Sequence, residues 1–118
     1  EYGTSKGLFL GFELQQVGIE KYFNKLKCGF NTNDNSNIIG FIKAIEKSIL
    51  DIIPEKQGKY PAYRIEEQLQ NGFIKIFYNT NQNTPTKYTS VKLLLKISGI
   101  WTSAKEYGVT FRFFFIRP

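Results

Sequence analysis

The feature that most constrains the fold is the alternation of apolar and polar residues between Lys87 and Ile116. Two alternating runs, 87–102 and 107–116, flank a short turn at 103–106, which is the pattern of an antiparallel hairpin. Side chains alternate between the two faces of a strand, so each run divides into two sets. The sets that we assign to the core are Val91, Leu93, Leu95, Ile97 and Trp101 in the first strand, and Val109, Phe111, Phe113 and Phe115 in the second.

The rest of the chain supplies further strands and helical segments. The apolar spacing predicts a helix over Ile38–Ile53, which Ser36 or Asn37 can cap and Pro54 ends. A shorter helix is expected at Ile19–Lys27, because Ile19, Tyr22, Phe23 and Leu26 keep helical spacing and Gly29 follows. Other expectations are strands at 7–14 and 72–78, polar loops at 31–37 and 79–86, and an extended or short helical element at 60–69.

Helices followed by a run of strands indicate an α+β fold. We expect a mainly antiparallel sheet of four to five strands with two helices on one face, with an OB-like barrel as the alternative. The length of 118 residues fits a single domain spanning 1–118. The chain starts at Glu1 without Met and stops at Pro118 directly after an apolar strand, so we expect a trimmed chain or one domain of a longer protein.

Composition excludes several kinds of chemistry. The chain has no His and a single Cys, so a zinc site, a disulfide framework and an imidazole-activated nucleophile cannot be built. The acids are scattered and no phosphate-binding or dinucleotide-binding motif occurs. We therefore expect a protein that is not an enzyme and uses no cofactor and no metal. A signal peptide and a long apolar run are also absent, so we expect an intracellular protein with no membrane partner.

The outward positions of the predicted strands combine cations with aromatic rings and carry no acid. They supply the candidate nucleic-acid-binding residues Lys75, Lys92, Lys96 and Arg112, with Phe73, Phe77 and Phe114 between them. We expect these positions to line up as one mixed face. Single-stranded nucleic acid needs cations near its phosphates and flat apolar surface under its bases. Strand residues two apart are separated by roughly 6–7 Å, which is close to the repeat of an extended nucleotide strand.

Other interpretations of this face stay open. The three Phe can face a second layer of core while the lysines extend to water, or the cations can protect the sheet from edge-to-edge pairing. The face can also be a protein interface. Part of the net charge of +6 can reflect AT-rich codons, which enrich Lys and Asn. The lysines of the two predicted helices are interpreted as solvated helix faces.

A family resemblance comes from the last hairpin, KLLLKISGIWTSAKEYGVTFRFFFI, at 92–116. Its first strand ends in Ser98-Gly99-Ile100-Trp101, and Tyr107-Gly108 opens an aromatic and basic strand after a short polar turn. This pattern resembles the C-terminal hairpin of single-stranded DNA-binding proteins of large double-stranded DNA viruses, over about a fifth of the chain. The resemblance implies a role in replication or recombination of a viral genome, in the host cytoplasm or nucleus.

The leading hypothesis is a domain that binds single-stranded nucleic acid, with DNA favoured over RNA and with little sequence preference. The alternative is a protein–protein interaction or assembly module, such as a viral structural or accessory subunit. The expected partners are single-stranded nucleic acid, further copies of the chain, or other replication proteins.

Overall fold

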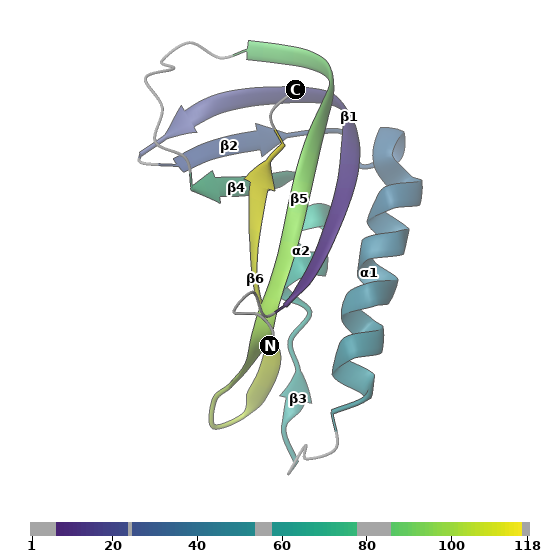
Figure 1. The fold of residues 1–118 in the computed structure, drawn as a ribbon, viewed down its shortest axis with the longest axis vertical. Helices are drawn as coiled ribbons and strands as arrows, with labels where there is room; N and C mark the ends of the chain where they lie inside the picture. The colour runs from purple at the N-terminus through teal and green to yellow at the C-terminus, as the bar shows by residue number, and fades with distance from the viewer. Residues whose placement is uncertain (1–6, 24, 54–57, 78–85, 117–118) are drawn as a thin grey trace.

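The computed structural model describes residues 7–23, 25–53, 58–77 and 86–116 (Figure 1). Its strands are β1 (Leu8–Tyr22), β2 (Lys25–Gly29), β3 (Tyr60–Pro61), β4 (Phe73–Phe77), β5 (Thr86–Thr102) and β6 (Glu106–Phe115). Its helices are α1 (Ser36–Asp51) and α2 (Arg64–Gln70), and a single 3-10 turn at Asn33–Asn35 precedes α1.

The described strands form one mixed sheet of six strands in the order β3-β6-β5-β1-β2-β4. Each neighbouring pair is antiparallel except β3 with β6, which is a short parallel pair. The predicted α+β class and the mainly antiparallel sheet are therefore confirmed. The expected number of four to five strands is too low, because β2 replaces a predicted helix and the two-residue β3 extends the edge.

The predicted helix at Ile19–Lys27 is wrong, because these residues belong to the β1–β2 hairpin. Ile19 pairs with Cys28 across the hairpin, and both side chains are buried. The chain reverses at Phe23, whose φ of 56° is a conformation that bulky residues seldom adopt. A Phe gives no turn signal in a sequence, so the helical spacing of the apolar residues is the more visible pattern there.

Other elements lie close to their predicted positions. Helix α1 begins two residues before the predicted 38, and the last two strands match the predicted hairpin. The segment 60–69 contains both alternatives, the short strand β3 and then α2. The first strand is longer than 7–14 because it continues to Tyr22. Pro54 and most of the predicted loop at 79–86 lie outside the described residues.

Strand β1 bends sharply near Gln16, whose φ is 55° (Figure 1). The buried positions change phase at this point, since Phe12 and Leu14 precede the bend and Val17 and Ile19 follow it. Before the bend β1 pairs with β5 alone, and after it β1 also pairs with β2. One strand therefore belongs to both halves of the sheet.

The buried side chain of Asn35 holds this bend. Its Oδ1 accepts a hydrogen bond from the N–H of Gln15 at 2.7 Å. Its Nδ2 donates to the carbonyl oxygen of Gln15 at 3.1 Å and to that of Asn31 at 2.9 Å. The last β1–β2 pair is Gly18 with Gly29, so at Gln15 the Asn35 amide takes the place that a neighbouring strand would fill.

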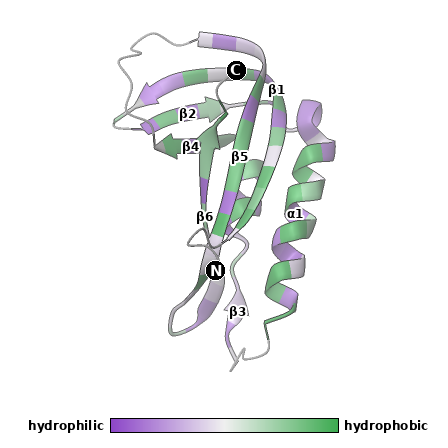
Figure 2. Ribbon diagram, viewed as in Figure 1, coloured by the Kyte–Doolittle hydropathy of each residue, from purple (hydrophilic) through white to green (hydrophobic). Residues whose placement is uncertain are grey.

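The curvature of the sheet brings β4 close to β6, with Cα atoms within 8 Å, although no ladder joins the two strands. The described sheet is therefore open and does not form a closed barrel. Buried side chains from β1, β2, β4, β5, β6 and both helices form one core cluster. Within it the rings of Phe12 and Phe113 meet edge to face, with centroids 5.9 Å apart. Apolar and polar residues are interspersed along α1, as an amphipathic helix on a core requires (Figure 2).

A buried carboxylate joins the two helices. Glu46 of α1 accepts hydrogen bonds from the N–H groups of Ile65 at 3.0 Å and Glu66 at 2.9 Å. These N–H groups lie in the first turn of α2, where a helix offers them no partner. Tyr63, the residue before α2, makes no side-chain cap hydrogen bond, so Glu46 supplies the cap from another helix. Lys43 adds an ion pair with Glu66 at 3.3 Å.

We expect Asn35→Ala to lower the free energy of unfolding by about 2–3 kcal/mol, because it leaves buried backbone groups of Gln15 without partners. Urea denaturation measures this change. Asn37→Ala is the matched control, since Asn37 is exposed in the first turn of α1, and it should shift the free energy by less than about 0.5 kcal/mol. Equal losses for the two variants would contradict the role given to the Asn35 amide.

Glu46 should make stability depend on pH. Burial raises its pKa above the ordinary value of 4.5, and the hydrogen bonds from Ile65 and Glu66 oppose this shift. The unfolded chain therefore ionises this group at lower pH than the folded chain does. The stability that Glu46 contributes is fully present below its unfolded pKa and is lost as the pH rises through the folded pKa.

The measurement is the free energy of unfolding of the wild type minus that of Glu46→Gln, which does not titrate. This difference should decrease as the pH rises above about 4.5, the ordinary pKa of the carboxyl group, and through its raised folded pKa. A difference that stays constant or rises with pH would show that the folded pKa is not raised.

Candidate nucleic-acid interface

The strand order decides which of the predicted binding residues share a surface. Strands β5 and β6 are neighbours, but β1 and β2 lie between β5 and β4. The expectation that the outward residues of β4, β5 and β6 line up as one face is therefore wrong. They divide into two patches on the outer side of the sheet, which we define as the side opposite the core.

The first group, called the β5–β6 patch, includes one residue from β1. Its members are Phe9, Lys92, Lys96, Arg112 and Phe114. Phe9, Lys96 and Arg112 form one row across the three strands. Phe9 is 46% exposed, and the Lys96 Nζ lies 5.6 Å from the centroid of its ring. This row therefore places two cations beside an accessible aromatic ring.

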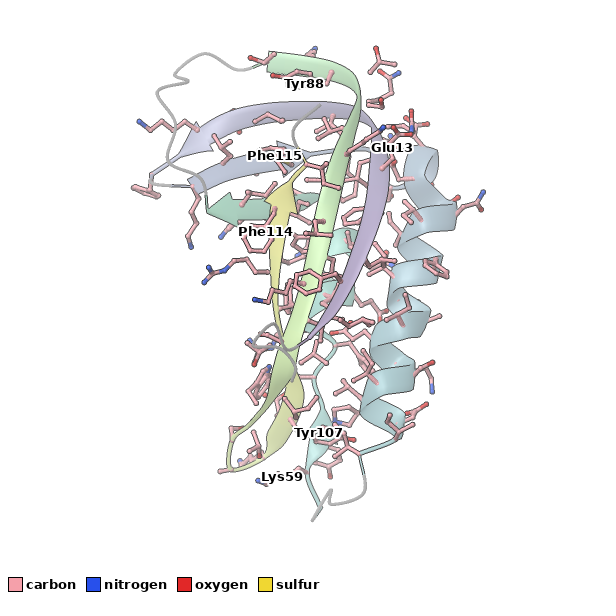
Figure 3. All side chains as sticks on the ribbon, viewed as in Figure 1. Glu13, Lys59, Tyr88, Tyr107, Phe114 and Phe115 are labelled. Carbon is pink, nitrogen blue, oxygen red and sulfur yellow. The ribbon has the colours of Figure 1, made fainter. Side chains whose placement is uncertain are left out.

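The next row of the β5–β6 patch is apolar. Gly11, Leu94 and Phe114 lie opposite one another, and Leu94 and Phe114 are both half-buried. The Ile116 Cδ1 lies 3.8 Å from the point that a Cβ on Gly11 would occupy. Phe114 lies near the end of β6, where part of its ring stays accessible to a ligand (Figure 3).

Strand β1 adds an acid to this patch. Glu13 lies opposite Lys92, and both side chains are exposed. Glu13 is near the bend of β1 (Figure 3), and its Oε1 accepts a hydrogen bond from Nε2 of Gln15 at 3.1 Å. The neighbouring carboxylate offsets the charge of Lys92, so the positive potential of the patch is strongest at Lys96 and Arg112.

The second group, called the β2–β4 patch, consists of Lys25, Lys27, Phe73 and Lys75. The Lys27 Nζ lies 4.6 Å from the centroid of the Phe73 ring, which is half-buried. Lys75 lies opposite Lys27 in the β2–β4 register and is exposed. The backbone of Phe77 pairs with Lys25, but the Phe77 side chain lies outside the described residues.

An acid also borders the β2–β4 patch, because Glu20 of β1 lies opposite Lys27. Lys27 thus has Glu20 on one side and Lys75 on the other. The two patches have the same kinds of group: a lysine ammonium over a phenylalanine ring, further cations, and one carboxylate contributed by β1.

Trp101 was predicted to lie in the core, and this prediction is wrong. A bulge shifts the β5–β6 register by one residue between Ile97 and Gly99, so Trp101 pairs with Gly108. The neighbours of Gly108 are buried in the core, so a Cβ on Gly108 would point to the outer side. That Cβ would lie 2.7 Å from Cζ2 of Trp101, which places the indole on Gly108.

Further contacts fix the Trp101 indole at the sheet edge. The Arg64 guanidinium carbon lies 5.0 Å from the centroid of its ring. Arg64 also forms an ion pair with Glu106 at 3.7 Å. The indole therefore packs against Gly108 and Arg64, which favours a structural role for Trp101 over base stacking.

Sequence reasoning missed Phe9, Lys25 and Lys27 as members of the outer side. Lys25 and Lys27 were assigned to a helix, and Phe9 was assigned to a strand whose faces were not sorted. One signal was present, since Val17 and Ile19, and then Leu26 and Cys28, repeat with the period of two that marks a strand.

The described part of the chain gives no support for a metal site, a reactive cysteine or a membrane-spanning helix. There, no group of three or more His, Cys, Asp or Glu residues is placed to hold a metal ion. Burial raises the pKa of the Cys28 thiol to about 12, so the thiol stays protonated and is a poor nucleophile. None of the helices in the described residues is long and apolar enough to cross a membrane.

Comparisons with protein-family models, with curated proteins and with solved structures found no match to this chain.

We expect Gly108→Ala to lower the free energy of unfolding by about 1–3 kcal/mol, because the added methyl group would collide with the Trp101 indole. Gly40→Ala in α1 is the control, since nothing lies within 4 Å of its added Cβ. The control should raise stability by up to about 1 kcal/mol, because Ala has the higher helix propensity. Denaturation followed by the emission of Trp101 measures both. A neutral Gly108→Ala would mean that the indole does not lie on Gly108.

Proposed function

We propose that this chain binds single-stranded nucleic acid, DNA in preference to RNA, through the outer side of its sheet. One observation carries the proposal: a lysine cation lies over a phenylalanine ring in each patch, Lys96 over Phe9 and Lys27 over Phe73. Such a pair offers a positive charge for a phosphate and a flat apolar surface for the adjacent base.

The register adds a second cation to each pair. Arg112 lies opposite Lys96, and Lys75 lies opposite Lys27. Neighbouring strands are about 4.8 Å apart, so a nucleic-acid strand that crosses the sheet would meet one cation after another. Every base has a π face, so stacking on these rings would confer little sequence preference.

The strand order supports the same function. Without the two-residue β3, the described residues form five strands, which are β1, β2, β4, β5 and β6 in chain order. The first strand pairs with the second, the second with the third, the first with the fourth, and the fourth with the fifth. The third and fifth strands, β4 and β6, lie close together without a ladder. We interpret this as an open variant of an OB-like barrel, whose second and third strands form the surface that binds oligonucleotides. In this chain those strands are β2 and β4, which carry the β2–β4 patch.

The helices leave this surface open. We infer that α1 and α2 both cover the inner face of the sheet, because Ile42 of α1 and Ile65 of α2 join the same core as Leu95 of β5. The outer side then has no helix over it. A long single strand could cross it without displacing part of the fold.

The biological setting rests on the hairpin at 92–116, which resembles single-stranded DNA-binding proteins of large double-stranded DNA viruses. We propose a non-enzymatic role in replication or recombination of a viral or AT-rich genome, inside the cell and without a cofactor. Further copies of the chain or other replication proteins are the additional partners.

Binding should depend on salt and on Lys96. With a fluorescein-labelled oligo-dT of about 20 nucleotides, log affinity should fall with log salt at a slope near −0.7 per phosphate contacted. Lys96→Glu should lower the affinity about tenfold at low salt and make the slope shallower, because it removes a phosphate contact. Lys105→Glu is the control, since it makes the same charge change at the exposed turn between β5 and β6 and should alter affinity less than about twofold.

Two outcomes would contradict this proposal. If the wild type does not bind the oligonucleotide at low salt, the chain is not a single-stranded nucleic-acid-binding domain. If Lys96→Glu and Lys105→Glu lose affinity equally, attraction comes from the net charge of +6 and not from the outer side of the sheet. The melting temperature of each variant, measured in parallel, shows that it is folded.

An assembly module is the second candidate, favoured by the apolar residues beside the cations. Phe9 and Ile116 are exposed large hydrophobic side chains, and the half-buried Leu94 and Phe114 lie near them. Sedimentation at several protein concentrations separates the two functions. An oligomer that forms with rising concentration and ignores both oligo-dT and salt would favour assembly.

A further inference from the structure

The curvature of the sheet brings together two strands that carry different patches. In the hydrogen-bonded order β1 and β2 lie between β5 and β4, so the patches are separate there. In space β4 and β6 have Cα atoms within 8 Å of each other, although no ladder joins them. The C-terminal end of β6 lies beside β4 (Figure 1), and we call this place the β4–β6 junction.

The two patches end at this junction. The β5–β6 patch ends at β6, whose outward residues include Arg112 and Phe114. The β2–β4 patch ends at β4, whose outward residues include Phe73 and Lys75. The outer side therefore continues from β1 over β5, β6 and β4 to β2. Neighbouring strands of a sheet are about 4.8 Å apart, so this route is roughly 20 Å long.

Phe114 lies at the junction. Phe113 and Phe115, on either side of it in β6, pack in or against the core, so the Phe114 side chain points to the outer side. It is half-buried near the end of β6 (Figure 3). Along the route, β6 lies between β5, which carries Lys96, and β2, which carries Lys27. The Phe114 ring thus supplies an apolar surface between a lysine of each patch.

The distribution of charge along the route suits a polyanion. No acid occurs within 73–77 of β4 or 108–115 of β6. Glu13 and Glu20, the carboxylates that border the patches, both belong to β1, which lies at the two ends of the route. The acids are therefore far from the junction, where a chain of phosphates would pass. Lys75 and Arg112 already interact within the chain, so the cations that we assign to phosphates below are those of the next strands on either side.

We propose that one nucleic-acid strand occupies both patches at once and passes from one to the other over Phe114, an inference that rests on the proposed function. Lys96 holds a phosphate on one side of the junction, and Lys27 holds a phosphate on the other. A base between these phosphates stacks on Phe114. An extended strand repeats every 6–7 Å or so, and a route of roughly 20 Å therefore takes about four nucleotides. This footprint is at the lower end of the range of about 4–16 nucleotides known for OB folds.

The number of oligonucleotides bound separates one route from two sites. The measurement is calorimetric titration at low salt with oligo-dT of six nucleotides, which covers the expected footprint with one nucleotide to spare at each end. A single route gives one hexanucleotide per chain. Two patches that bind separately give two, and this result would overturn the inference.

Charge reversal in each patch shows whether both contribute to the same binding event. Lys27→Glu and Lys96→Glu should each lower the affinity for the hexanucleotide about tenfold and leave one site per chain. Lys105→Glu, at the exposed turn between β5 and β6, is the control and should change affinity less than about twofold. If only one of the two patch variants loses affinity, the strand occupies one patch and the inference is wrong.

Variants of Phe114 test the crossing itself. Phe114→Leu keeps an apolar side chain without a π face, so it should bind the hexanucleotide about tenfold more weakly and an abasic hexanucleotide like the wild type. Phe114→Tyr keeps the π face and should stay within about twofold. Phe41→Leu is the control, because Phe41 is 53% exposed on α1, away from both patches. Equal losses on both oligonucleotides would show that the ring shapes the sheet and does not stack.

These results keep the inference apart from the proposed function. If the wild type binds the hexanucleotide and Phe114→Leu binds it equally well, the strand does not cross at Phe114, and the proposed function stands. The same holds if two hexanucleotides bind to one chain. If the wild type binds neither the hexanucleotide nor the longer oligo-dT at low salt, the proposed function fails and the single route fails with it.

Discussion

The side chain of Asn35 makes the shape of this sheet possible. A strand that bends exposes backbone groups that no neighbouring strand can pair, and such groups are costly when buried. At Gln15 both groups are satisfied by one amide, which accepts through Oδ1 and donates through Nδ2. Because the bend at Gln16 is held in this way, β1 can pair with β5 up to Ile19 and with β2 from Gly18 onward.

A second buried polar group extends the same principle to the helices. Glu46 accepts from two N–H groups of α2, and Asn35, directly before α1, pairs with the backbone of β1. Each side chain satisfies backbone groups about 20 residues away in sequence. Helix α1 is thereby fixed to β1 at its start and to α2 in its later turns. Polar contacts with defined geometry specify this docking more narrowly than apolar packing alone does.

The parts that could be predicted from the sequence are those determined by local periodicity. Leu93, Leu95 and Phe113 are buried as their alternation predicts, and α1 lies where the apolar spacing places it. The β1–β2 hairpin was not predicted, because a Phe with positive φ lies at its reversal and the apolar residues around it keep helical spacing. The position of Trp101 depends on a one-residue bulge, which inverts every side chain beyond it. Long-range pairing decides which strands are neighbours. The division of the outward residues into two patches therefore could not be predicted from the sequence either.

The proposed interface is best judged by comparing the contacts that a ligand would replace with those that it would form. An exposed cation–π contact is worth about 0.5–1 kcal/mol, whereas a stacked base is worth about 1–3 kcal/mol. A base could therefore displace Lys27 from Phe73, or Lys96 from Phe9, with a net gain. The displaced ammonium would remain close enough to pair with the adjoining phosphate. Because Glu13 and Glu20 lie opposite lysines of the two patches, the retained positive charge is moderate. A surface of this kind would bind single strands reversibly, with an affinity that salt controls and sequence hardly affects.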